Sequence, residues 1–334
     1  MPSAIVECVP NFSEGRNKGI IDALALAISA NAGVRLLDID QGPDANRTVY
    51  SFIGSPDAVA RAALDAARAA YVLIDMSKHS GVHPRIGALD VCPFVPVSGT
   101  DLGSCVELSR RVGEGLASEL GVPVYLYEAA ASRPERRSLA AIRSGEYEGL
   151  SAKLARPEWA PDFGPAAFVP RWGATAVGAR GFLIAYNINL DTEDERLAKE
   201  IAFKIRESGR ASERPGRLKE VRAIGWYIDS YRCAQVSINL LDFKTTPLHI
   251  VFETVKEEAK KLGLLVTGGE IVGLVPRDAI LEAGRHFSRK TEASEVDLVE
   301  TAIRSLGLDS VRPFDPAKKI VEYSGMGILS SSRR

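Results

Sequence analysis

A short stretch of the chain, residues 78–90, gathers side chains that can move protons. It holds two of the four histidines, His79 and His83, together with a lysine, an arginine and an aspartate. Two glycines within it permit unusual backbone conformations, and the strand-like residues 91–97 follow directly. Titratable groups on a loop at the end of a sheet are typical of proton-transfer chemistry near neutral pH.

The spacing of these two histidines leaves three interpretations open. Histidines four residues apart on a helix can share a Zn²⁺ ion, but Gly81 and Pro84 interrupt a helix here, and Ser80 stands where the zinc-protease motif has glutamate. The second interpretation is a general acid–base histidine whose tautomer a carboxylate fixes. The third is a loop histidine that only caps backbone groups.

Other polar side chains could complete such a site. Asp38 and Asp40 end a predicted strand, and one of them could be buried against a histidine while the other only faces solvent. Arg47 opens the next strand and could bind a substrate carboxylate through its planar fork, or be an ordinary surface arginine. His249 and His286 lie in helical, apolar surroundings, and we expect structural roles for both.

A second segment, residues 162–173, combines aromatic side chains with glycine and proline. Phe163, Phe168 and Trp172 on such a loop could stack on a flat heterocycle, while the glycines let backbone groups approach its edge. The alternative is a hydrophobic plug between two parts of the fold. Residues 173–178 are glycine-rich but lack a preceding strand and the P-loop lysine, so phosphate binding is a weak prediction.

The elements that must position these residues repeat. Strands and helices follow the order β-α-β-β-α-β from residue 5 to residue 127, and again from residue 182 to residue 275. This is the order of a ferredoxin-like unit, with helices on one face of a mainly antiparallel sheet. Residues 129–181 between them are predicted to be irregular. We therefore predict an α/β (α+β) fold with subdomains at 1–181 and 182–334 and a ligand groove between them.

Capping signals predict where some helices begin. Ser13 is suited to cap the helix that contains residues 20–28, and Ser55 the helix that runs to about residue 74. Thr192 and Glu195 have the spacing of a capping box for the helix over residues 192–208. The last residues, Ser330–Arg334, are expected to be loose.

Composition narrows the class of protein. A formal net charge of −1 gives no reason to expect nucleic acid as a partner, and no apolar run is long enough to span a bilayer. The N-terminal residues read as a first strand rather than a signal peptide. Four scattered cysteines without paired spacing indicate buried free thiols in a reducing compartment. We expect a cytoplasmic protein.

Four long motifs resemble one enzyme family, and the resemblance runs from about residue 4 to beyond residue 310. The family is that of the glutamate formimidoyltransferases, and the motifs are ECVPNFSEG at residues 7–15, NRTVY at 46–50, HPRIGALDVCPF at 83–94 and GPAAFVPRWG at 164–173. The resemblance implies an enzyme that moves the formimidoyl group from N-formimidoyl-L-glutamate to N5 of tetrahydrofolate in histidine degradation. It also implies two α/β subdomains with folate between them, and a homodimer.

The resemblance also assigns roles to residues. It makes His83 the catalytic histidine, leaves His79 in a less strict part of the motif, and places Asp40 near the active site. Arg47 and Arg85 are candidates to bind the carboxylates of the donor. The stretch that matches the folate-binding motif consists of Gly164, Pro165, Ala166, Ala167, Phe168, Val169, Pro170, Arg171, Trp172 and Gly173.

The implied chemistry suits one histidine. Attack by N5 on the amidine carbon requires N5 to lose a proton and the glutamate nitrogen to gain one, and a group that titrates near neutrality can do both in turn. No metal is expected, and tetrahydrofolate is a co-substrate. The alternatives are a glutamate formyltransferase that acts on 5-formyltetrahydrofolate, a non-catalytic folate-binding module and a metal hydrolase.

Overall fold

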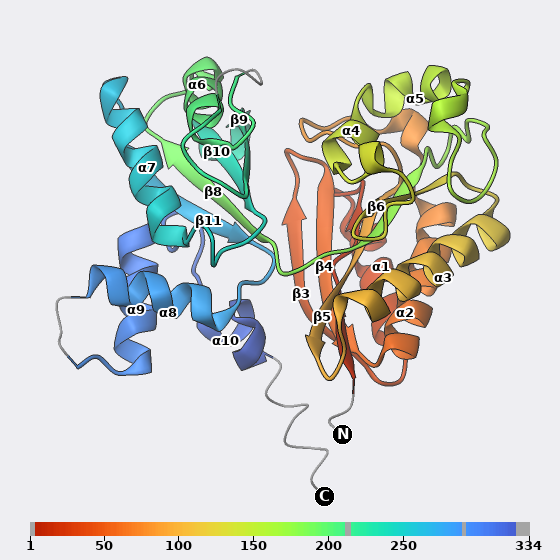
Figure 1. The fold of residues 1–334 in the computed structure, drawn as a ribbon, viewed down its shortest axis with the longest axis horizontal. Helices are drawn as coiled ribbons and strands as arrows, with labels where there is room; N and C mark the ends of the chain where they lie inside the picture. The colour runs from red at the N-terminus through yellow and green to blue at the C-terminus, as the bar shows by residue number, and fades with distance from the viewer. Residues whose placement is uncertain (1–3, 211–214, 289–291, 325–334) are drawn as a thin grey trace, which may run out of the picture. The chain divides into compact units, whose positions relative to one another are not determined.

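The structure, a computed structural model, describes residues 4–210, 215–288 and 292–324. The chain divides into two compact units, residues 1–181 and residues 182–334 (Figure 1). The last residues, which the sequence predicts to be loose, lie outside the described part. Among the described residues, no helix combines the length and apolar character needed to cross a bilayer.

The first unit is built on a seven-stranded sheet with the order β1-β4-β2-β5-β7-β6, to which β3 adds beside β4. All pairings are antiparallel except β5 with β7 and β7 with β6, which are parallel. The strands are β1 (Ile5–Cys8), β2 (Asn11–Phe12), β3 (Val34–Gly42), β4 (Arg47–Gly54), β5 (Leu89–Ser98), β6 (Val124–Glu128) and β7 (Thr175–Ala179).

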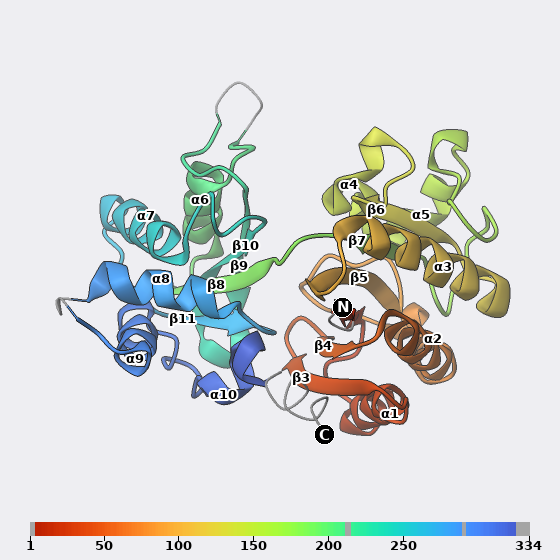
Figure 2. The same ribbon diagram turned by 60° about the horizontal axis from the view of Figure 1, so that its bottom comes forward.

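Helices cover both faces of this sheet. On one side lie α1 (Lys18–Ser29), α2 (Pro56–Leu73) and α3 (Leu102–Leu120), grouped on the same flank in both views (Figures 1 and 2). The alternation of β6 shows the two faces: Val124 and Leu126 pack in the cluster with these helices, whereas Tyr125 and Tyr127 belong to a second apolar cluster. That second cluster includes side chains from α4 (Leu139–Arg143) and α5 (Glu146–Leu154).

The prediction that residues 129–181 are irregular was therefore wrong. Besides α4 and α5, this segment contains the 3₁₀ turns η2 (Pro134–Arg136) and η3 (Pro157–Trp159), and β7 is inserted between β5 and β6. Its small residues misled the prediction. Gly178 is required because a Cβ there would lie 2.5 Å from the ring and the carbonyl oxygen of Tyr127.

The second unit contains a four-stranded antiparallel sheet with the order β11-β8-β10-β9. Its elements are β8 (Ile184–Leu190), α6 (Glu195–Ile205), β9 (Val221–Ile228), η4 (Asp229–Tyr231), β10 (Cys233–Leu240), α7 (Leu248–Lys261) and β11 (Val266–Val272), followed by α8 (Arg277–Phe287), α9 (Glu295–Leu306) and α10 (Pro316–Lys319).

The two units share one strand order. Numbering β8, β9, β10 and β11 as first to fourth gives the order 4-1-3-2, and β1, β3, β4 and β5 pair in the same order in the first unit. In each set one helix follows the first strand and another follows the third. The prediction of two ferredoxin-like subdomains with mainly antiparallel sheets is confirmed.

Two predicted caps were wrong, because a residue nearer the helix competes for the exposed N–H groups. Asn17 caps α1, and Ser13 instead donates its hydroxyl to the carbonyl oxygen of Gly87 at 2.7 Å. Asp194 caps α6 by accepting from the N–H of Arg196, while Thr192 accepts from the N–H of Asp194. Short acidic and amide side chains make such bonds readily.

Candidate active site

The histidine loop connects the 3₁₀ turn η1 (Met76–Lys78) to β5 and lies against the turn between β3 and β4. Asn46 of that turn accepts from the N–H of Gly15 and donates to the carbonyl oxygen of Ser80. At Gly81 the two backbones approach so closely that a Cβ would lie 2.3 Å from the carbonyl oxygen of Ala45. Glycine in this motif therefore permits close packing of the loop.

Both ring nitrogens of His79 form hydrogen bonds that hold the loop in place. Its Nε2 lies 2.8 Å from the carbonyl oxygen of Asn46, and its Nδ1 accepts from Nε of Arg85 at 3.3 Å. This pattern requires a proton on Nε2 and none on Nδ1, which is the neutral ring. Burial accordingly lowers the pKa of His79. The interpretation as a backbone-binding loop histidine describes this residue.

His83 is held by different partners. Its Nδ1 lies 2.7 Å from the carbonyl oxygen of Pro84, which can only accept, so Nδ1 carries the proton. Its Nε2 lies 2.5 Å from Nη1 of Arg47, which can only donate. The ring is therefore neutral, with the lone pair of Nε2 directed at the guanidinium.

The charges around His83 favour this neutral state. Burial lowers the pKa of His83 well below its usual 6.5, and the positive charges of Arg47 and Arg143 lower it further. Burial and Arg143 in turn lower the pKa of Arg47 to about 10, while Asp90 and Asp40 act in the opposite direction. The site thus holds a proton acceptor beside a guanidinium that is itself poorly solvated.

A buried ion pair supports the loop from behind. Asp90 is fully buried on β5, and one carboxylate oxygen accepts from the N–H of Ile86 at 2.9 Å. The other oxygen pairs with Arg143 of α4. The sequence motif contains Asp90 without indicating its role, and nothing local to Asp90 marks Arg143, an arginine 53 residues away, as its partner.

Of the two aspartates at the end of β3, Asp40 is the buried one. It is 4% exposed and lies opposite Val49 of β4, two residues from Arg47 along that strand. The negative charge of Asp40 raises the pKa of Arg47 and so partly offsets the effect of burial. Asp38 lies opposite Ser51 and is only half-buried. The structure thus brings Asp40, Arg47 and His83 together.

Arg85 has partners that compete with the predicted substrate role. Its guanidinium binds Glu148 at 2.5 and 2.8 Å and Glu146 at 3.0 Å, which raises its pKa. These three residues and His79 help to line an open hollow of about 500 Å³. The carboxylate-binding role of Arg85 stays a prediction, and the observed contacts tie α5 to the histidine loop.

The segment 164–173 lies beside the histidine loop within the first unit. An isolated bridge joins Gly87 to Gly173, and Ala88 N–H donates to the carbonyl oxygen of Trp172. Gly173 has φ +80°, and a Cβ on it would lie 2.0 Å from the carbonyl oxygen of Ile86. Both glycines of this bridge allow the two backbones to touch.

The aromatic residues of this segment have unequal exposure. Trp172 is 0% exposed and donates from Nε1 to Oγ1 of Thr175, so it is a core residue and cannot offer its ring to a ligand. The expectation that Trp172 stacks on a heterocycle is thus not met. Phe168 is half-buried, with its ring 5.3 Å from that of Tyr147. The exposed residues of the segment are Gly164, Pro165, Ala166, Ala167, Pro170 and Arg171, and Val169 is half-buried.

The remaining histidines and the cysteines form no metal centre in the described part of the chain, where no cluster of three or more potential ligands occurs. The rings of His249 and His286 stack in the second unit with their centroids 4.1 Å apart. All four cysteines are free, as predicted, although Cys233 is only partly buried.

Family models match both units of the chain. The N-terminal subdomain of the formiminotransferase domain matches residues 5–180, and a second model, the formiminotransferase domain, matches residues 185–325. The chain belongs to the formiminotransferase domain family. This confirms the resemblance drawn from the four motifs.

Curated relatives of the formiminotransferase family agree. The chain is 54% identical to the formimidoyltransferase-cyclodeaminase of Sus scrofa over 96% of its own length and 60% of that protein. It is 56% identical to the Gallus gallus protein of the same name, covering 59% of it. The chain thus spans about 60% of the length of these bifunctional relatives. A glutamate formimidoyltransferase of Streptococcus pyogenes serotype M1 is 44% identical over 85% of this chain and 93% of that protein.

Proposed function

We propose that this protein is a glutamate formimidoyltransferase, which transfers the formimidoyl group from N-formimidoyl-L-glutamate to N5 of tetrahydrofolate. The observation that carries the proposal is the neutral ring of His83, with its Nε2 lone pair at the side of Arg47. The similarity to the Streptococcus pyogenes enzyme over 93% of its length supports the choice of reaction.

In the proposed reaction His83 moves one proton twice. Its Nε2 accepts the proton that N5 loses when the new C–N bond forms, and returns it to the glutamate nitrogen as the old C–N bond breaks. The Nδ1 bond to Pro84 keeps Nε2 available throughout. Asp40 offsets the positive charge of the imidazolium between the two steps, when the former amidine carbon is tetrahedral.

In this proposal Arg47 controls when His83 can act as a base. While its guanidinium donates to Nε2 of His83, that nitrogen cannot accept another proton. A carboxylate of the donor forms stronger, charge-assisted hydrogen bonds with a guanidinium than a neutral imidazole does. We infer that donor binding draws Arg47 away and thereby exposes the base only when substrate is present.

Residues 164–173 are the proposed folate-binding segment. Phe168 presents the half-buried ring, and the exposed residues beside it leave backbone groups open to the pterin edge. Trp172 acts here as the anchor that holds the segment on the sheet. We further propose that the protein is a cytoplasmic homodimer and uses tetrahydrofolate without a metal.

The test of this function is turnover of the full chain with tetrahydrofolate and N-formimidoyl-L-glutamate. Release of L-glutamate and formation of 5-formimidoyltetrahydrofolate are expected. Activity only with 5-formyltetrahydrofolate and L-glutamate would instead make the protein a formyltransferase. Tight folate binding that survives loss of His83, with no turnover of either pair, would make it a binding module.

A further inference from the structure

The sheet of the second unit has one apolar and one polar face. Along β8 the residues Ile184, Tyr186, Ile188 and Leu190 enter an apolar cluster with α6 and α7. The residues between them include Asn187 and Asn189, and the same alternation on β10 and β11 adds Cys233, Gln235 and Glu270 to the polar face. A sheet whose second face carries buried amides and a carboxylate is built for polar contacts.

A chain of hydrogen bonds orients these amides. Nε1 of Trp226 donates to Oε1 of Gln235 at 2.8 Å, and because an indole can only donate, the nitrogen of Gln235 must face the other way. That nitrogen donates to Oδ1 of Asn189 at 2.8 Å. The Nδ2 group of Asn189 is thereby left as a donor, and it has no partner within the described residues.

The neighbouring carboxylate does not take up this donor. Oε1 of Glu270 accepts from Asn187 and Gln235 at 3.3 and 3.0 Å, and Oε2 accepts from Tyr231 and Arg312 at 3.1 and 3.2 Å. With four donors in place, Glu270 is a saturated anchor of the network. Asn189 is only 3% exposed, and it is the residue of this network whose donor is left for a ligand.

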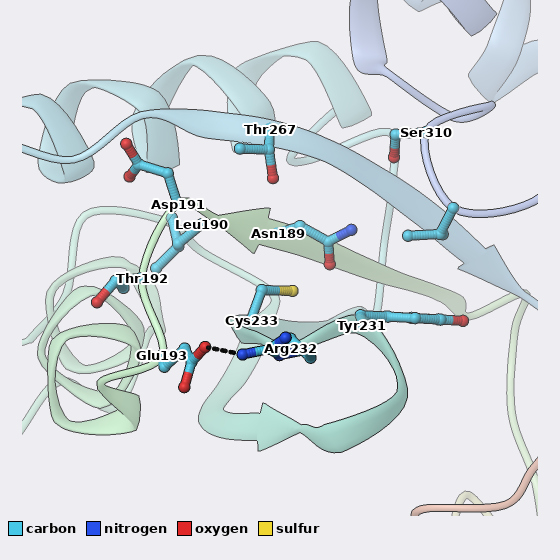
Figure 3. A pocket seen from close by; sticks show the side chains of 11 residues that line it. Asn189, Leu190, Asp191, Thr192, Glu193, Tyr231, Arg232, Cys233, Thr267 and Ser310 are labelled. Atoms are coloured by element: carbon cyan, nitrogen blue, oxygen red, sulfur yellow. Dashed lines mark ion pairs between the residues drawn. The ribbon is translucent and has the colours of Figure 1, made fainter.

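Asn189 opens into a cavity of about 470 Å³ that residues of the second unit line (Figure 3). In the view of Figure 3, Asp191 and Glu193 lie at the left, and Tyr231 and Ser310 at the right. Arg232 pairs with Glu193 at 3.6 Å, and both side chains are largely exposed, so this ion pair is weak and open to competition. The cavity therefore offers the carboxylates of Asp191 and Glu193 on one side, and the amide donor of Asn189 with the hydroxyl groups of Tyr231 and Ser310 on the other.

We propose that this cavity binds a free α-amino acid, with its carboxylate on Nδ2 of Asn189 and its ammonium group at Asp191 and Glu193. A zwitterion matches a lining that carries both signs of charge, whereas a simple anion would face the two acidic side chains. The inference rests on the geometry of the second unit. It relies on the proposed function only for the choice of the product L-glutamate as the probe.

Indole signals give a direct test, because the chain has three tryptophans and one of them belongs to the network. In the full chain labelled with ¹⁵N-tryptophan, L-glutamate without folate is expected to shift the Nε1–H signal of Trp226. Asn189→Asp keeps the acceptor for Gln235 but loses the donor, and is expected to weaken binding by about tenfold or more. Asn239→Asp, at an exposed position of the neighbouring strand β10, is the matched control and is expected to bind as the wild type does.

Three results would overturn this site. They are an unmoved Trp226 signal, equal affinity of Asn189→Asp and the wild type, or glutarate binding as tightly as L-glutamate, since glutarate lacks the ammonium group. Should Asn189→Asp fail to fold, exposed Glu193→Gln replaces it, with weakened binding expected and unchanged binding overturning the site. Repeating the titration in His83→Ala separates the site from the proposed activity, because binding there is expected to persist without turnover.

Discussion

The two units use the last strand of the same four-strand set for a buried carboxylate. Asp90 lies on β5 and Glu270 on β11, and an arginine from a later segment pairs with each, Arg143 and Arg312 respectively. The partners on the other oxygen differ. Asp90 accepts from the backbone of Ile86, whereas Glu270 accepts from side-chain amides.

That difference separates two kinds of chemistry. By fixing the backbone at Ile86, Asp90 stabilises the loop that presents His83 and its proton acceptor. Glu270 fixes amides instead, and the network ends in a donor on Asn189. One scaffold position thus supports proton transfer in the first unit and polar recognition in the second, because different groups are ordered around it.

The largest expected effect is at His83. His83→Ala is expected to lower kcat by roughly two to four orders of magnitude, the usual scale for loss of a general acid–base group. Folate binding is expected to persist, because residues 164–173 are fixed by backbone bonds that this change leaves in place. Steady-state kinetics with equilibrium folate binding measures both, and near wild-type turnover would refute the assignment.

The two carboxylates are expected to differ in their contribution to stability. Asp90→Asn leaves Arg143 buried without its counter-charge and is expected to cost about 3–5 kcal/mol. Glu270→Gln also removes a counter-charge, but Arg312 is already 40% exposed to solvent, so the expected loss of unfolding free energy is only about 1–3 kcal/mol. Urea unfolding measures both changes when it is monitored at Trp159 and Trp172 for the first unit and at Trp226 for the second. Equal losses, or a loss in the wrong unit, would break the comparison.

The contact between the two motifs depends on glycine. At Gly87 a Cβ would lie 2.1 Å from the carbonyl oxygen of Ala174, so Gly87→Ala is expected to destabilise the first unit by about 1–3 kcal/mol and to weaken folate binding. Gly149→Ala on α5 is the control, since a Cβ there meets nothing within 4 Å. Alanine favours a helix, so this variant is expected to be as stable as the wild type or slightly more so.

The smallest expected effect is a change in the pKa of one histidine. Because burial favours the neutral ring, His83 takes up a proton at lower pH in the folded state than in the unfolded chain. The unfolding free energy is therefore expected to fall as pH drops below about 6.5. Arg47→Gln removes a positive charge and is expected to raise the pKa of His83 towards 6.5. NMR titration of the histidines in the wild type and the variant measures this, with His249 in the second unit as the internal reference. An unchanged or lower pKa would contradict the role of Arg47.

The sequence predicted the order of the elements, because the alternation of apolar residues along a strand reports which face is buried. It failed at β7, where small residues such as Gly178 resemble a loop although packing against Tyr127 requires them. The prediction that Trp172 stacks on a ligand rested only on its being aromatic. Whether an aromatic ring faces a ligand or the core depends on what covers it, and α2 residues such as Tyr71 lie against this one.

The sequence by itself determined the motifs, the ferredoxin-like order of each unit and His83 as the residue of interest. Only the tertiary structure decided its partners. Arg47 is 36 residues away in the chain and reaches Nε2 because the turn between β3 and β4 packs against the histidine loop at Gly81. Asp90 and Arg143 meet because α4 returns to the sheet. Local patterns carry no record of such long-range pairs, since the distance between two side chains is set by the path of the chain between them.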